Sequence, residues 1–432
     1  MRKLIIPIII FVFIGLFLSA GCENQHKPQK IYQSSLINPS FEELQAFYES
    51  GYNAINGSVK LNNVDGLQNM LTLSNVISIK GSLNISLNSS LVSLEGLEDL
   101  ISIDGPLIVE SNASLTNIDG LSSLTSVGYG LSIVENNKIT NIDGLSSLTS
   151  IDGSLIVESN GSLTNIDGLS SLTSVGSDLR IVENNKLTNI DGLSSLTSID
   201  RYLIVESNGS LTNIDGLSSI TSIGRLLTVE SNASLTNIDG LSSLTSIGKY
   251  LYVNYNGSLT NIDGLSSITS IGINLSVKHN GSLTNIDGLT NLTSVGENLR
   301  IFQNNKLTNI DGLSSLTSVG RILSVGYNGS LTNINGLSSL TSVGRGLRIV
   351  ENNKLTNIDG LSSLTSVGGH YSIISNIILS NLCGIKNILT YNGVEGNNYP
   401  FMEEYEYYNN NNIINNAYNP SVEDIIDGNC SQ

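Results

Sequence analysis

The sequence predicts an all-β solenoid of about thirteen coils with small helical caps at its N-terminal and C-terminal ends. Three observations predict this fold. The tetrad Asn-Ile-Asp-Gly begins at residue 117 and recurs every 24 residues up to residue 357, with Asn335 replacing the Asp once. Apolar residues within a coil do not follow a 3.6-residue helical stripe. Short segments on both sides of the array lack the repeat and carry helix signals.

One coil shows how the repeat is organised. Counted from Gly105, its first two apolar residues alternate as in a strand, and the next five are mostly spaced by three. These residues are Leu107, Val109, Leu115, Ile118, Leu121, Leu124 and Val127. We therefore expect a triangular turn of extended segments with seven inward side chains. A single coil cannot offset the entropy of ordering its backbone, so the coils must stack on one another.

An Asn after the strand of each coil predicts a ladder of side-chain amides. This column contains Asn112, Asn136, Asn160, Asn184 and Asn208, and it continues at the same spacing to residue 352. Because stacked strands lie ~4.8 Å apart, each amide can donate to the next copy or to corner carbonyls. The column therefore predicts a structural role.

The Asp of the tetrad forms a second column, which contains Asp119, Asp143, Asp167 and Asp191. Carboxylates stacked in this way repel each other, so we expect each one to accept backbone N–H bonds at its corner. A row of calcium ions is the alternative. However, one carboxylate per copy gives poor calcium coordination, and the Gly-Gly-x-Gly-x-Asp signature of calcium β-rolls is missing. We predict no metal and no other cofactor.

The outward strand positions change along the array. Early coils carry Ile108, Ile156 and Ile204 beside glutamates, and these coils alternate with ones that carry Ser132 and Arg180. From residue 251 onward the same positions carry Tyr252, Tyr255, Lys278, His279, Arg300, Phe302 and Tyr327. Aromatic rings beside hydrogen-bonding groups suit a carbohydrate or a peptide, so we predict a ligand face here. Drift on a tolerant β-face is the alternative interpretation.

Composition excludes one class of partner. The 432 residues include 20 Lys and Arg against 37 Asp and Glu, which gives a net charge of −17. This charge opposes a phosphate backbone, so we predict no nucleic-acid partner. The chain has three His and three Cys, which leaves little material for a metal site.

The N-terminal residues predict export. Met1-Arg2-Lys3 precede an apolar run over residues 4–18, which is too short to favour a membrane-spanning helix. The ending Ser19-Ala20-Gly21-Cys22 resembles a bacterial lipoprotein signal, with Ser19 where that pattern prefers Leu. The resemblance implies lipid attachment at Cys22, and ordinary cleavage or a retained anchor is the alternative. We therefore expect a protein of the cell envelope, outer membrane or cell surface, anchored in the membrane through lipid.

The expected organisation has five segments. They are a lipoprotein signal peptide (1–21), a tether (22–39), an N-terminal helical cap (40–56), the solenoid (57–376) and a C-terminal cap (377–432). Ser40 is expected to cap a helix over residues 41–50 whose Phe41, Leu44 and Phe47 cover the first coil. Asn419-Pro420 is expected to open a second helix, which Gly428 stops.

Cysteine counting bears on the second cap. With Cys22 committed to lipid, Cys383 and Cys430 remain, and in an oxidising compartment we expect them to form a disulfide. Two free buried thiols are the alternative. The segment from 391 to 416 is interpreted as a loop over the end of the array, or alternatively as a binding tail.

The repeat also resembles a known family. The string Leu-x-Ile-x-x-Asn-x-x-Leu-x-x-Ile-x-Gly-Leu-x-x-Leu-x-x-Val-Gly, complete over residues 299–320, resembles the receptor L-domain. With its flanks at 41–52 and 416–430, the mature chain resembles L-domain-type repeat lipoproteins of Bacteroidota. The resemblance implies a leucine-rich-repeat-like, right-handed β-helix. A leucine-rich-repeat horseshoe is the structural alternative.

These observations predict a surface-anchored, non-enzymatic binding or adhesion protein whose partner is a glycan or a protein at the cell surface. No set of residues nominates a nucleophile, and the three His are far apart in sequence. The first alternative is a β-helix carbohydrate-active enzyme. The second is an ice-binding protein or a purely structural envelope protein. The columns of Thr are the reason for considering ice binding.

Overall fold

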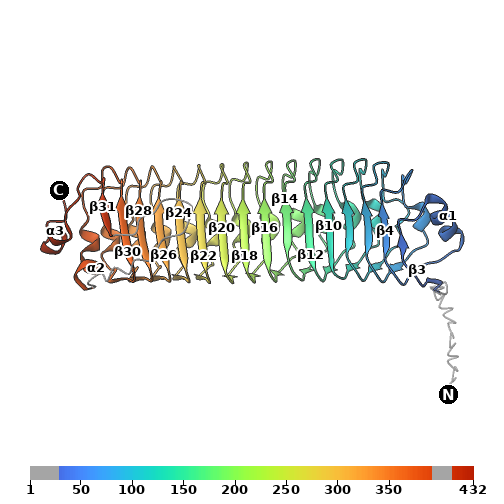
Figure 1. The fold of residues 1–432 in the computed structure, drawn as a ribbon, viewed down its shortest axis with the longest axis horizontal. Coiled ribbons are helices and arrows are strands. Elements are labelled where there is room, and N and C mark those ends of the chain that lie inside the picture. The colour runs from blue at the N-terminus through green and yellow to red at the C-terminus, as the bar shows by residue number, and fades with distance from the viewer. Residues whose placement is uncertain (1–28, 392–410) are drawn as a thin grey trace, which may run out of the picture.

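The computed structural model describes residues 29–391 and 411–432 and shows one long stack of coils (Figure 1). Each coil contributes one strand to a first sheet of 15 strands and one strand to a second sheet of 16 strands. Neighbouring strands are parallel and pair in steps of 24 residues through the array, as in Leu131 with Leu155. The predicted all-β repeat solenoid is confirmed.

The first sheet has short strands of two residues each. They are β1 (Ile31–Tyr32), β3 (Ala54–Ile55), β5 (Ser78–Ile79), β7 (Ser102–Ile103), β9 (Ser126–Val127), β11 (Ser150–Ile151), β13 (Ser174–Val175), β15 (Ser198–Ile199), β17 (Ser222–Ile223), β19 (Ser246–Ile247), β21 (Ser270–Ile271), β23 (Ser294–Val295), β25 (Ser318–Val319), β27 (Ser342–Val343) and β29 (Ser366–Val367).

The second sheet has longer strands, of four or five residues in the regular coils. They are β2 (Leu36–Ile37), β4 (Val59–Asn62), β6 (Leu83–Ser86), β8 (Leu107–Glu110), β10 (Gly130–Val134), β12 (Ser154–Glu158), β14 (Leu179–Val182), β16 (Tyr202–Glu206), β18 (Leu226–Glu230), β20 (Tyr250–Asn254), β22 (Asn274–Lys278), β24 (Asn298–Phe302), β26 (Ile322–Gly326), β28 (Gly346–Val350), β30 (His370–Ile374) and β31 (Asn412–Ile414).

Short 3-10 helices, which the repeat pattern did not predict, replace some of the expected extended backbone. They are η1 (Leu71–Leu73), η2 (Asp119–Leu121), η3 (Asp143–Leu145), η4 (Asp167–Leu169), η5 (Asp191–Leu193), η6 (Asp215–Leu217), η7 (Asp239–Leu241), η8 (Asp263–Leu265), η9 (Asp287–Leu289), η10 (Asp311–Leu313), η11 (Asn335–Leu337), η12 (Asp359–Leu361) and η13 (Cys383–Ile385).

Glycine is required inside η2 to η13 because neighbouring coils approach closely. A Cβ atom on Gly120 would lie 1.9 Å from the carbonyl oxygen of Leu94 in the preceding coil. The same corner lies against the core, which runs the length of the stack between the two sheets. In the coil that begins at Gly105, all seven apolar side chains named above are buried.

The N-terminal cap contains helix α1 (Phe41–Glu49), which packs against η1. Ser40 and Glu43 form a capping box at its start. Leu44 and Phe47 are buried, but Phe41 is 52% exposed, so the expectation that Phe41 covers the first coil was wrong. Position 41 lies in the first turn of the helix, and the buried stripe begins at Leu44.

The expected tether is partly wrong as well. Strands β1 and β2 lie inside residues 22–39 and pair with β3 and β4, so the ordered body begins before residue 40. The ring of Tyr32 contacts that of Phe47 at a centroid distance of 5.4 Å, which ties β1 to the cap. Cys22 and the predicted signal peptide lie outside the described residues.

The C-terminal cap contains α2 (Lys386–Tyr391) and α3 (Val422–Asp427) at the opposite end of the stack (Figure 1). Ser421, rather than Asn419-Pro420, caps α3, and Gly428 ends it at φ 95°. Of the segment from 391 to 416, residues 392–410 lie outside the described residues, whereas β31 extends the second sheet by pairing with β30.

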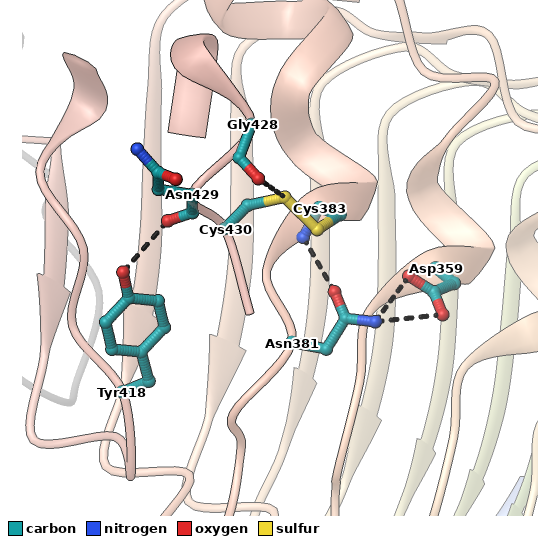
Figure 2. The surroundings of a disulfide bond; sticks show 7 residues. All are labelled: Asp359, Asn381, Cys383, Tyr418, Gly428, Asn429 and Cys430. Carbon is teal, nitrogen blue, oxygen red and sulfur yellow. Dashed lines mark hydrogen bonds between the residues drawn. A yellow bond between two sulfur atoms is a disulfide. The ribbon is translucent and has the colours of Figure 1, made fainter. Parts of the chain in front are cut away.

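Cys383 and Cys430 form a disulfide that joins η13 to the end of the chain, with their Cα atoms 5.0 Å apart (Figure 2). The backbone N–H of Cys383 donates to Asn381 Oδ1, and Asn381 Nδ2 donates to both carboxylate oxygens of Asp359. Tyr418 Oη donates to the carbonyl of Asn429. The last coil is thus linked to the cap covalently and by hydrogen bonds.

In the described portion of the chain, no helix is both long enough and apolar enough to cross a membrane.

Candidate functional site

The predicted ligand face lies on the outer surface of the second sheet. In β20, Leu251 and Val253 are buried in the core, whereas Tyr252 between them points outward. In β24 the alternation is the same, and Arg300 and Phe302 are half-buried on the outer surface. The period of two in these strands therefore places the three side chains on one face.

The other aromatic side chains of the face come from the corner directly after each strand. Tyr255, His279 and Tyr327 have φ of 57°, 55° and 57°, in the left-handed region that disfavours residues other than Gly. Tyr255 is 50% exposed. The corner turns the chain sharply, so its side chain lies at the C-terminal edge of the strands rather than in the core.

The Asn ladder holds this corner in place. The side chain of Asn256, the residue after Tyr255, donates from Nδ2 to the carbonyl of Val229 at 2.8 Å. Its backbone N–H donates to Asn280 Oδ1 in the following coil at 3.0 Å. Each amide thus bonds to the coils before and after it and offsets the unfavourable φ of the preceding residue.

The ladder is longer than predicted. The Asn residues expected to form it, from Asn112 at every 24th residue to Asn352, are fully buried and make these bonds. The structure adds Asn88 before them, and Asn376 and Asn416 at the far end. Asn88 and Asn376 keep the 24-residue spacing and could have been found from it. Asn416 follows the inserted segment, which breaks the spacing.

The aromatic residues form contacting pairs on adjacent coils. The rings of Tyr255 and His279 are stacked with their centroids 4.3 Å apart, and those of Phe302 and Tyr327 lie 5.7 Å apart. Tyr250, which was not among the predicted residues, lies 6.0 Å from Tyr252. Its position just ahead of the strand's first core residue was the missed signal. The structure therefore brings the predicted residues together as one surface, which we call the aromatic face.

Charge changes sign along the outer surface of the second sheet. The coils before the aromatic face carry acidic side chains at the strand ends and corners. These are Glu110, Glu135, Glu158, Glu183, Glu206 and Glu230. The aromatic face and the coils after it carry Lys278, Arg300 and Arg348, with Glu351 as the acidic residue among their described strand ends and corners. Within a chain of net charge −17, this end of the sheet is a basic region.

The pKa shifts follow this arrangement. Burial lowers the pKa of Arg300, and the positive charges of Arg321 and Arg348 lower it further, while Tyr252 acts in the opposite direction. Burial and then the charge of Lys278 lower the pKa of His279, which favours a neutral imidazole at pH 7.

Beside the basic region, a hollow of ≈ 380 Å³ is lined by Arg321, Arg345, His370 and four glycines.

The Asp column differs from what we expected. The backbone N–H of Asp119 donates to Asn117 Oδ1 at 3.2 Å, and the copies at Asp143, Asp167 and Asp191 bond in the same way to the Asn two residues earlier. In these four repeats the corner acceptor is thus Asn, and the Asp side chain is exposed. The expectation that Asp accepts the corner N–H was wrong, because Asn precedes Asp at the spacing that this turn requires.

Across residues 29–391 and 411–432, no three His, Cys, Asp or Glu side chains are placed so that they could hold a metal ion.

The family described as BspA type leucine rich repeat region matches the chain in six copies, over residues 87–209, 204–324 and 255–378. No curated protein matches the sequence. The matched ranges together cover more than half of the chain, from residue 87 to residue 378.

Solved structures with a related course of the chain include an internalin from Listeria monocytogenes. It is 19% identical with a TM-score of 0.41, and the match covers 83% of this chain and 89% of that one. The TLR13 chain of a TLR13–ssRNA13 complex is 17% identical with a TM-score of 0.27, covering 77% of this chain and 50% of that one. The plant peptide hormone receptor RGFR1 in complex with RGF2 is 12% identical with a TM-score of 0.17, covering 83% and 79%.

Proposed function

Because the chain belongs to the BspA-type leucine-rich repeat family, whose stacked coils form extended surfaces, we propose that it is a non-enzymatic binding protein. The aromatic face of the second sheet is the proposed ligand site. A glycan or a protein at a cell surface is the proposed partner. The proposed architecture includes right-handed winding, which parallel strands with crossovers strongly favour, and about thirteen regular coils.

One observation carries this proposal. The core residues and the Asn ladder keep the same residue types through the array, but the outward side chains change near residue 250 from aliphatic and acidic to aromatic and basic. Folding does not require this change, because the earlier coils stack in the same register without it. A ligand that contacts only a portion of the sheet accounts for it.

We further propose that the protein is exported and attached to a membrane through a lipid on Cys22, in the cell envelope, the outer membrane or at the cell surface. The support is the sequence of residues 1–22, with its basic start, apolar run and terminal Ser-Ala-Gly-Cys. The proposed organisation keeps the five segments named above, except that the ordered body starts at β1 and not at residue 40.

The test compares the unchanged protein with a variant in which Tyr252 and Tyr255 are both replaced by Ala. Binding is measured by a pulldown from envelope or host-surface material and by a glycan array. We expect ligand binding to weaken about tenfold or more, since aromatic residues dominate such surfaces, with little change in thermal unfolding. The matched control replaces Ile204 and Ser207, which hold the equivalent positions in the acidic half, by Ala.

Equal affinity of the tyrosine variant and the control would dismiss the aromatic face as the site. Incubation of the protein with each glycan that it binds distinguishes a binding protein from a carbohydrate-active enzyme. Release of shorter products would overturn the non-enzymatic proposal.

A further inference from the structure

The middle outward position of the second-sheet strands alternates between a large and a small side chain in the second half of the array. Tyr252, Ser276, Arg300, Ser324, Arg348 and Ser372 are consecutive partners across neighbouring strands. The three Ser are 6%, 5% and 4% exposed, so they form the floors of notches between the large side chains. We call this row the arginine column.

The spacing of the large side chains limits which polymer can follow the column. Strands lie ~4.8 Å apart, so Tyr252, Arg300 and Arg348 recur every ~9.6 Å along the stack. An extended peptide presents side chains on one face every ~6.6 Å, so its neighbouring side chains do not match the ~9.6 Å between Arg300 and Arg348. Two linked pyranose rings of an extended polysaccharide span a length close to the spacing of the column. A polyproline II peptide, with a pitch of about 9.3 Å, is the competing occupant.

Charge and ring contacts bear on whether the ligand is a polysaccharide or a polyproline II peptide. Arg300 and Arg348 are two coils apart with Ser324 between them, and Arg348 Nε is a buried atom without a hydrogen-bond partner among the described residues. A negative group recurring at the same interval would bond to each guanidinium. Phe302 extends over Gly326, where an added Cβ would meet its ring at 2.9 Å, and it contacts Tyr327. The rings of Phe302 and Tyr327, tilted by 44° to each other, form an apolar platform beside the two Arg, on which sugar rings can pack.

We propose that the arginine column binds a linear anionic polysaccharide that carries one acidic group on every second sugar ring, in register with Arg300 and Arg348. The platform of Phe302 and Tyr327 supports the sugar rings next to the charges. This inference rests on the proposed function and specifies its ligand class.

The experiment measures binding of the exported chain to hyaluronan oligosaccharides, which carry a carboxylate on alternate rings, by calorimetry at low and at physiological salt. Carboxyl-reduced hyaluronan, oligogalacturonate of equal ring number with a carboxylate on every ring, and an acidic polyproline peptide are the comparison probes. We expect hyaluronan to bind most tightly per charge, with affinity falling as salt rises.

Arg300→Gln and Arg348→Gln are each expected to weaken hyaluronan binding about tenfold, and the double variant about a hundredfold, because each removes one charge-assisted contact. The matched control is Arg180→Gln. Arg180 holds the same position in the acidic half and lies 4.0 Å from Glu158, so its loss should leave binding unchanged. Circular dichroism and thermal unfolding of each variant check that the stack remains folded.

Four outcomes would overturn the inference. Tighter binding of oligogalacturonate in proportion to its charge would show attraction without register. Tighter binding of the acidic polyproline peptide would show a protein ligand. Absence of hyaluronan binding, while the tyrosine variant still loses binding to surface material, would reject the ligand class and leave the proposed function intact. Absence of hyaluronan binding together with unchanged binding of the tyrosine variant to surface material would reject both this inference and the proposed function.

Discussion

At the scale of single residues, the corner after each second-sheet strand links stability to function. The residue at this corner has a left-handed backbone in every regular coil, although it is Asn, Leu, Ser, Glu, Tyr, His or Gln rather than Gly. Its conformation is held by the Asn that follows it, through bonds to two neighbouring coils, so its own side chain has no structural task. The array can therefore place Tyr255, His279 or Tyr327 there without disturbing the stack.

The Asn ladder gives the first stability prediction. Asn184→Ala removes an acceptor from the backbone N–H of Asn160 and a donor from the carbonyl of Val157, and both groups remain buried. Because unsatisfied buried groups cost about 1–3 kcal/mol each, we expect a loss of about 2–5 kcal/mol in the free energy of unfolding. Urea titration followed by circular dichroism measures it.

Asn185→Ala is the control for this prediction. Asn185 is the next residue in the chain and is exposed, so its replacement should change the free energy of unfolding by less than about 0.5 kcal/mol. Similar effects of the two substitutions would show that the ladder does not stabilise the corner.

At the scale of elements, the sequence predicts what repeats and misses what is short. The 24-residue period and the inward residues lead directly to the stack, because each copy repeats the same evidence. The strands β1 and β2, of two residues each, carry no periodic signal, so the segment before residue 40 reads as a tether. The 3-10 helices have three residues each and are likewise too short for a helical pattern.

The sequence predicts which residue types make up the candidate site, but not how their side chains contact one another. The sequence shows where aromatic and basic residues gather, and strand alternation puts Tyr252, Arg300 and Phe302 on one side. It does not show that Tyr255 and His279 stack, because that contact depends on the left-handed corner backbone. Nor does it show that Phe302 lies across Gly326, which depends on rotamers in adjacent coils.

The C-terminal cap gives a prediction at this scale. Replacing both Cys383 and Cys430 by Ser removes the link between η13 and the end of the chain. The chain-entropy model gives about 4 kcal/mol for a loop of this length, so we expect the cap to open more often. Hydrogen exchange should rise in α3 and in the backbone bond from Leu382 N to the carbonyl of Cys430, while the central coils stay protected.

The double replacement avoids a single reactive thiol, and α1 at the opposite end of the stack is the internal control. Faster exchange at both ends would show a global loss of stability instead of local opening. Unchanged exchange in α3 would show that packing alone holds the cap.

At the scale of the whole molecule, stacking identical coils also stacks their charges. The exposed Asp column runs beside the core through η2 to η12, interrupted by Asn335. The second sheet divides its charge instead, with an acidic region followed by a basic and aromatic region. Because the core is the same in each coil, the charge of one surface column does not depend on that of another. One rigid stack can therefore combine a column of repelling carboxylates with a proposed binding face.

The last prediction concerns the pH dependence that this edge creates. Burial, and then the charges of the neighbouring Asp, raise the pKa of Asp143, Asp191 and Asp263 above 3.8. The folded state therefore binds protons more readily than the unfolded state, and these groups make the protein more stable as pH falls through their folded pKa toward 3.8. The lowered pKa of His279 and His370 acts oppositely, removing stability as pH falls below about 6.5.

Asp191→Asn isolates the contribution of the column, and the chain itself shows that Asn fits. Asn335 keeps the corner bond, donating its N–H to Asn333 Oδ1 at 3.0 Å. We expect the variant to have a higher urea midpoint than the wild type at pH 7 and low salt, and this advantage should shrink at high salt and as pH approaches about 4. Asp152→Asn, the same charge change outside the column, is the control. A lower midpoint for Asp191→Asn would mean that the carboxylate has a favourable partner. If calcium chloride also raised the wild-type midpoint more than sodium chloride of equal ionic strength, that partner would be calcium, because screening alone cannot distinguish the two salts.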